Sequence, residues 1–117
     1  MTYQLCIDVP YPLRVQIGRL GELVLPRCKC VYTGSAKRNL ESRVARHLRQ
    51  EKKLRWHIDY LLAQPNVSVE QVLRFSEPEC DINQQVEGSV VLAGFGSSDC
   101  KNGCGSHLKL LRGTNVG

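Results

Sequence analysis

The sequence predicts a single small α+β domain, and three observations support this prediction. The chain has 117 residues, the usual length of one domain built around one hydrophobic core. Hydrophobic residues make up 42% and charged residues 23% of the chain, which is the composition of a globular rather than a disordered protein. Segments that alternate apolar and polar residues are mixed with segments of helical periodicity, without a repeat or a linker. We therefore expect one domain over residues 1–117.

The first third of the chain is predicted to form strands. Residues 3–9 alternate at period two and are followed by two prolines, which end the strand. Residues 14–18 and 22–25 are two short strands around Gly18 and Gly21, and they predict an N-terminal hairpin. Residues 28–33 form the next predicted strand.

A helix is predicted over residues 39–50, with Asn39 as its N-cap. At about 100° per residue, Leu40, Val44 and Leu48 form its apolar stripe. Four further side chains of this helix are candidates for chemistry. Arg43 and His47 are expected at the edge of the stripe, between core and surface, and Arg46 and Arg49 are expected to face phosphate or solvent.

The rest of the chain is predicted to add a buried helix, a strand, a short helix with acidic residues in its first turn, a loop with two glycines, and a last strand. In that order they occupy residues 54–64, 67–75, the segment beginning at 77–79, 94–99 and 106–111.

The charge is distributed unevenly. The net charge is +5, and residues 37–55 contain eight of the 16 basic residues and two acidic ones. Such a cluster attracts phosphodiester backbones by releasing counterions, although a solvated helix face has the same composition. Residues 70–87 carry five acids against one arginine, and acidic and basic clusters side by side suit metal-assisted phosphate chemistry. The candidate contacts to nucleic acid are Lys37, Arg38, Arg46 and Arg49.

No apolar run is long enough to span a bilayer, and no signal peptide opens the chain, so the cytoplasm is the expected compartment. In that compartment six cysteines indicate reduced thiols or a metal site rather than disulfides. Cys100, Cys104 and His107 have the residue types and spacing for tetrahedral zinc, with Cys80 or Asp99 as the fourth ligand. Ordinary buried thiols are the alternative.

Residues 32–36 (Tyr-Thr-Gly-Ser-Ala), 39–40 and 43–47 (Arg-Val-Ala-Arg-His) resemble the second half of the GIY-YIG nuclease motif. That motif has a Tyr-x-Gly strand end, followed by a helix with an inward arginine and, in several branches, a histidine one turn later. Tyr3 stands where the tyrosine of the first tripeptide would be, and Glu79 stands where the family's metal-binding glutamate opens a later helix. Residues 53–62 and 94–100, together with Glu79-Cys80 and residues 106–108, are similar to signatures of one branch, the DUF123 group or Uri superfamily.

This resemblance implies a domain with a central antiparallel sheet flanked by helices. It also implies that the domain hydrolyses phosphodiester bonds with one divalent metal, Mg²⁺ or Mn²⁺. Tyr3 and Tyr32 would position or deprotonate the attacking water, and His47 would assist Tyr32. Arg43 would hold the scissile phosphate, and Glu79 would bind the metal.

The sequence therefore predicts a metal-dependent endonuclease acting on DNA. Two alternatives stay open. The asparagine that often closes the family's site has no match in residues 94–99, which leaves a non-catalytic nucleic-acid-binding module. A zinc-stabilised protein-interaction domain would also account for the cysteine and histidine pattern.

Overall fold

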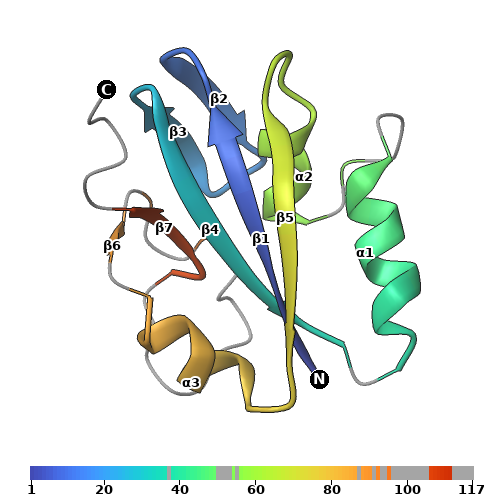
Figure 1. Cartoon of the computed structure of the whole chain (residues 1–117). Helices are drawn as coiled ribbons and strands as arrows, with labels where there is room; N and C mark the ends of the chain where they lie inside the picture. Colours follow the sequence, from blue (N-terminus) through green and yellow to red (C-terminus); the bar gives the residue numbers. More distant parts are fainter. Residues whose placement is uncertain are drawn as a thin grey trace.

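A five-stranded antiparallel sheet, in the order β5-β1-β4-β7-β6, forms the centre of the molecule (Figure 1). The computed structural model describes residues 1–36, 38–49, 54, 56–86, 88–90, 92, 95 and 106–111. The five strands are β1 (Thr2–Val9), β4 (Cys28–Ser35), β5 (Ser68–Phe75), β6 (Gly88–Val90) and β7 (Leu108–Leu111). With the helices that flank this sheet, the α+β class predicted from the sequence is confirmed.

The predicted N-terminal hairpin is also present. The strands β2 (Leu13–Ile17) and β3 (Gly21–Leu25) pair antiparallel and form a two-stranded sheet of their own. The turn between them uses positive φ angles of 46° at Gly18 and 136° at Gly21, a backbone conformation that glycine adopts without a Cβ clash.

Among the described residues, three helices connect or follow the strands: α1 (Leu40–Leu48), α2 (His57–Leu62) and α3 (Glu79–Gln84). Helix α1 lies against the Tyr3 face of the sheet, and α3 lies against the opposite face at Ser35. Figure 1 shows α1 and α3 on either side of the end of the sheet where β1 begins. Helix α1 has nine residues, and no helix in the described part of the chain is long and apolar enough to cross a membrane.

Asn39 is at the N-cap position of α1, as predicted, with a φ of 55° and without a side-chain capping hydrogen bond. The predicted start of α2 is wrong, because this helix begins at His57 rather than at residue 54. Asp59 Oδ2 accepts a hydrogen bond from the Trp56 backbone N–H at 2.9 Å, so the side chain of Asp59 caps the helix at Trp56.

The core lies between the Tyr3 face of the sheet and the helices α1 and α2. Alternate residues of β1 contribute to it, from Tyr3 to Val9, with Tyr32 and Cys30 beside them on β4. The other face of β1 carries Thr2, Gln4 and Cys6. This alternation follows from period-two side-chain geometry, and Thr2 and Gln4 on the other face are buried as well.

The predicted apolar stripe of α1 is wrong at one position. Leu40 and Val44 are buried, but Leu48 is 50% exposed and His47 is 2% exposed. At about 100° per residue, His47 lies only about 20° from the direction of Leu40, whereas Leu48 lies about 80° away on the other side. His47 therefore points into the core.

Candidate functional site

Tyr3 and Gly34 are paired across β1 and β4, and their contact shapes the site. A Cβ at Gly34 would lie 2.5 Å from both Cζ and the hydroxyl oxygen of Tyr3. Gly34 is not among the glycines with positive φ, so its backbone does not require glycine. The steric requirement comes instead from the tyrosine ring, which lies across the β4 backbone at this position.

The Tyr3 hydroxyl is hydrogen-bonded to Nε2 of His47 over 2.7 Å, and both side chains are buried. The sequence predicted that His47 would assist Tyr32, and that it would lie at the boundary between core and surface. The second statement is wrong, because His47 is 2% exposed. The first stays a prediction: the ring of His47 meets Tyr32 edge to face, with centroids 6.2 Å apart, while its Nε2 is hydrogen-bonded to the Tyr3 hydroxyl.

Burial governs the electrostatics of both tyrosines. It raises the pKa of Tyr3 well above its ordinary value, and the nearby Arg43 opposes this effect through its charge and a hydrogen bond. Burial also raises the pKa of Tyr32, and the charge of Glu79 adds to the rise for both residues. Both hydroxyls are therefore protonated at neutral pH.

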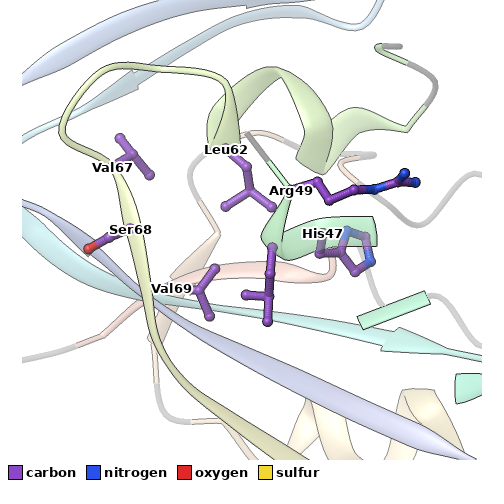
Figure 2. A pocket seen from close by; sticks show the side chains of 7 residues that line it. His47, Arg49, Leu62, Val67, Ser68 and Val69 are labelled. Carbon is purple, nitrogen blue, oxygen red and sulfur yellow. The ribbon is translucent and has the colours of Figure 1, made fainter. Parts of the chain in front are cut away.

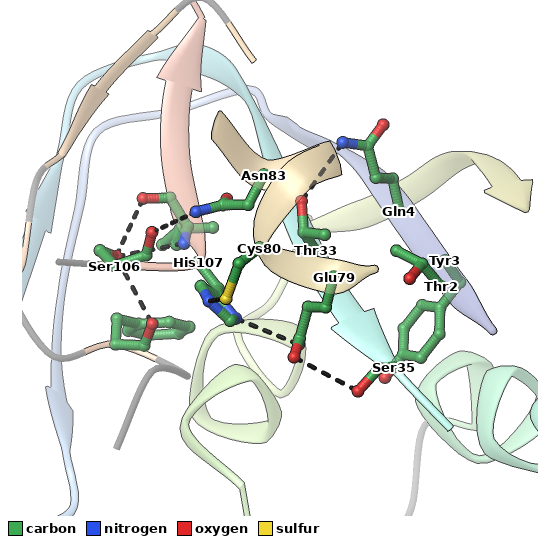
Figure 3. A network of polar contacts seen from close by, with 12 residues as sticks. Thr2, Tyr3, Gln4, Thr33, Ser35, Glu79, Cys80, Asn83, Ser106 and His107 are labelled. Carbon is green, nitrogen blue, oxygen red and sulfur yellow. Dashed lines mark hydrogen bonds and ion pairs between the residues drawn. The ribbon is translucent and has the colours of Figure 1, made fainter. Parts of the chain in front are cut away.

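Ser35 connects the other two predicted site residues. An Arg43 guanidinium N–H donates to the Ser35 carbonyl oxygen over 2.6 Å, and the Ser35 hydroxyl donates to Glu79 Oε2 over 3.3 Å. Figure 3 shows Tyr3, Ser35 and Glu79 at this end of the sheet. The structure therefore brings Tyr3, Arg43 and Glu79 together, from β1, α1 and α3. Ser35 was not singled out from the sequence, although it directly follows Gly34 at the strand end.

On its other side, Glu79 meets His107. Its Oε1 lies 3.1 Å from His107 Nδ1, and His107 Nε2 lies 3.9 Å from Cys80 Sγ (Figure 3). With the proton on Nδ1, His107 donates to the carboxylate and accepts from the thiol. Two of the predicted zinc ligands, Cys80 and His107, are therefore neighbours, whereas Cys100 and Cys104 lie outside the described residues. Within the described part of the chain, no group of three His, Cys, Asp or Glu side chains is arranged to hold a metal.

Arg46 does not face solvent or phosphate, so that prediction is wrong. Its guanidinium makes two hydrogen bonds to the Asp59 carboxylate, at 2.9 and 3.0 Å. The Asp59 side chain is fully buried and that of Arg46 is 16% exposed. A buried carboxylate needs such a partner because desolvation of an unpaired charge is costly. Arg38 and Arg49 are exposed as expected, and Lys37 lies outside the described residues.

A small pocket lies at the end of α1, against α2 and the start of β5 (Figure 2). Its volume is about 190 Å³, below the usual range for ligand sites. Tyr3, Arg43 and Glu79 are not among its lining residues, so it is separate from the cluster around Ser35. The lining residues are His47, Leu48, Arg49, Leu62, Val67, Ser68 and Val69.

The protein thus has an α+β fold, with a polar cluster at one end of its sheet. The cluster is formed by Tyr3, Arg43, Ser35 and Glu79. The chain matches the family model described as domain of unknown function DUF123 over residues 2–115. It belongs to this family. It matches none of the curated proteins and none of the solved structures with which it was compared.

Proposed function

We propose that this protein is a divalent-metal-dependent endonuclease of the GIY-YIG superfamily that hydrolyses phosphodiester bonds in DNA. One observation carries the proposal. Ser35 contacts both the Arg43 guanidinium and the Glu79 carboxylate, and Arg43 also interacts with the Tyr3 hydroxyl. A group that can move a proton, a phosphate-binding cation and a metal-binding carboxylate are the three components that phosphodiester hydrolysis needs.

Tyr3 and His47 would activate the nucleophile. Because burial raises the pKa of Tyr3, the deprotonated form of Tyr3 is disfavoured before the reaction. The Tyr3 hydroxyl proton must therefore leave while the water attacks. The hydrogen bond to His47 Nε2 provides the acceptor. The attacking water gives its proton to the Tyr3 oxygen while the Tyr3 proton passes to His47, so that the histidine holds the proton at the end of the step.

Arg43 would hold the scissile phosphate. Its contact at Ser35 is a neutral carbonyl oxygen, and no ion pair of Arg43 occurs in the described part of the chain. Its charge is therefore available to a non-bridging phosphate oxygen, where negative charge grows in the transition state.

Glu79 would bind the metal. Mg²⁺ in proteins is usually held by one or two carboxylates together with waters, and Glu79 with the neighbouring Ser35 hydroxyl is a donor set of this kind. A bound Mg²⁺ or Mn²⁺ supplies a Lewis acid for the leaving oxygen. The contact with His107 leaves one carboxylate oxygen directed toward Ser35.

DNA is the proposed substrate because of the basic residues around α1. Arg38 and Arg49 are exposed near the two ends of this helix, and the chain carries a net charge of +5. Exposed arginines that neutralise backbone phosphates give affinity without sequence preference.

The test is a cleavage assay on DNA with and without Mg²⁺, comparing wild type with Glu79→Gln. Loss of the metal-binding oxygen should lower the cleavage rate by roughly a hundredfold or more, while DNA affinity stays level. Glu77→Gln is the matched control. It removes the same charge from an exposed carboxylate whose side chain bonds Ser76, and its rate should stay near that of wild type.

Two outcomes would refute the nuclease proposal: a wild-type protein that cuts no DNA in Mg²⁺ or Mn²⁺, or a Glu79→Gln variant that cuts at the wild-type rate. Salt-dependent DNA binding without cleavage would instead favour the non-catalytic binding module.

We also propose a structural Zn²⁺ that Cys80 and His107 help to hold. Their side-chain atoms are 3.9 Å apart and buried, close to the separation of two ligands around tetrahedral zinc. The contact of His107 with a carboxylate is the usual arrangement behind a zinc-bound histidine. Cys100 and Cys104 are the sequence-predicted partners. Metal analysis should find about one zinc per chain, and Cys80→Ser should lose it; a metal-free wild type purified without chelators would refute the zinc site.

A further inference from the structure

Three side chains of α1 meet one indole ring, that of Trp56 at the start of α2. The guanidinium carbons of Arg43 and Arg46 lie 4.9 and 4.3 Å from the ring centroid. The ring of His47 lies 5.5 Å away. Two of these three, Arg43 and His47, are groups to which the proposed nuclease mechanism gives a role.

The indole itself is held from two directions. The backbone N–H of Trp56 donates a hydrogen bond to Asp59 Oδ2, and the Arg46 guanidinium donates to both oxygens of the same carboxylate. Arg46 in turn lies over the indole. Asp59 is fully buried, so its carboxylate has little freedom to move. It holds the Trp56 backbone and the Arg46 guanidinium, and these two groups keep the indole ring in place.

Arg43 and Arg46 differ in how their charge is balanced. Asp59 neutralises Arg46, whereas the hydrogen bond of Arg43 to Ser35 is to a neutral carbonyl. An arginine that must bind a phosphate has to be held in place without being neutralised. A cation–π contact does this, because the face of the ring attracts the guanidinium without supplying a negative charge.

We propose that Trp56 is a positioning residue for Arg43, and that the Arg46–Asp59 ion pair holds Trp56 in place. The inference rests on the proposed function, because it concerns the arginine that would bind the scissile phosphate. It also gives a role to the Trp-His-Ile-Asp-Tyr segment at residues 56–60. Trp56 positions Arg43, and Asp59 holds Trp56 in place.

The experiment is a double-mutant cycle with Trp56→Leu and Arg43→Ala. The probe is a DNA duplex with phosphorothioate linkages, which resists cleavage, and both its affinity and the cleavage of ordinary duplex are measured in Mg²⁺. With Arg43 present, Trp56→Leu should lower affinity and cleavage about tenfold. With Arg43→Ala, the same change should have almost no further effect, because it acts through Arg43.

Conservative and control variants separate positioning from stability. Trp56→Phe keeps an aromatic face and should retain affinity within about threefold, and it also serves if Trp56→Leu folds poorly. Tyr60→Leu removes another aromatic ring of α2, one that lies beside Gly18, and should leave affinity unchanged. Trp56 is the one tryptophan of the chain, so its fluorescence should respond to the duplex in wild type and not in Arg43→Ala.

An equal loss from Trp56→Leu in both backgrounds would overturn the inference and leave Trp56 a packing residue. Binding that does not depend on Arg43 would overturn it as well. Wild-type protein that binds the duplex through Arg43 and Trp56 but cuts no DNA would sink the nuclease proposal and leave the positioning role standing.

Discussion

Gly34→Ala is a substitution whose effect can be worked out from the contacts of Tyr3. The new methyl group would lie 2.5 Å from Cζ and from the hydroxyl oxygen of Tyr3, where unstrained contacts need about 3.5 Å. Gly34 is held in β4 by its pairing with Tyr3 on β1, so the strand cannot easily withdraw. The tyrosine ring must therefore move by about 1 Å.

That movement breaks a buried hydrogen bond. The Tyr3 hydroxyl lies 2.7 Å from His47 Nε2, and a shift of about 1 Å takes this distance beyond the hydrogen-bonding range. We expect a cost of about 1–3 kcal/mol for overpacking and about 1 kcal/mol for the lost bond. At roughly 3–5 °C per kcal/mol for a chain of this size, the melting temperature should fall by about 10 °C. Cleavage should fall up to about a hundredfold, because the proton-accepting group is displaced.

The assay is thermal unfolding of wild type, Gly34→Ala, Tyr3→Ala and the double variant. Once the ring is removed, the methyl group has space, and Gly34→Ala should then be neutral or stabilising by up to about 1 kcal/mol. The coupling free energy between the two positions should thus be at least about 2 kcal/mol. Equal destabilisation by Gly34→Ala in both backgrounds would show that the clash with Tyr3 is not the cause.

Three further predictions follow from the paired and buried side chains. Arg49→Ala should weaken DNA binding and reduce the slope of log affinity against log salt concentration by about one. Arg46→Ala should leave this slope unchanged, because Asp59 already neutralises the charge of Arg46. Fluorescence anisotropy titrations over a salt series measure both slopes, and equal changes in the two variants would contradict the prediction. Asp59→Asn should cost about 3 kcal/mol in urea unfolding, because Arg46 loses its buried counter-charge; a cost below about 1 kcal/mol would contradict a tight ion pair. Burial raises the folded-state pKa of Tyr32 above its ordinary value of 10.0. The stability that this hydroxyl contributes is therefore complete below pH 10.0 and is lost as the pH rises above it, by up to about 1.4 kcal/mol per pH unit. Tyr32→Phe should lack this part of the decline in stability at alkaline pH, and identical declines in both proteins would refute the prediction.

The strands were predictable because burial on one face of a sheet leaves a period-two pattern in the sequence. The prediction for residues 3–9 differs from β1 by one residue, and the prediction for 67–75 differs from β5 by one. The helix ends were less predictable. The start of α2 depends on Asp59, whose carboxylate caps the helix at Trp56 and is held by Arg46 from α1, and no local pattern records that contact.

The candidate site was predictable in its residue types but not in its contacts. The resemblance to the GIY-YIG motif named Tyr3, Arg43 and Glu79, and the structure brings Arg43 and Glu79 to Ser35, with Tyr3 beside Arg43. It did not name Ser35, whose role depends on a backbone carbonyl and a hydroxyl that point toward two different helices. It paired His47 with Tyr32, and did not name the hydrogen bond between His47 and Tyr3.

The sequence by itself determined the α+β class, the period-two pattern of β1, the N-terminal hairpin and the concentration of basic residues around α1. Only the tertiary structure decided that His47 is hydrogen-bonded to Tyr3, and that Arg46 is neutralised while Arg49 remains exposed. The physical reason is that local periodicity sets the direction of a side chain relative to its own helix or strand. Its partner depends on which other element packs in that direction, and Asp59 reaches Arg46 only because α2 folds back against α1.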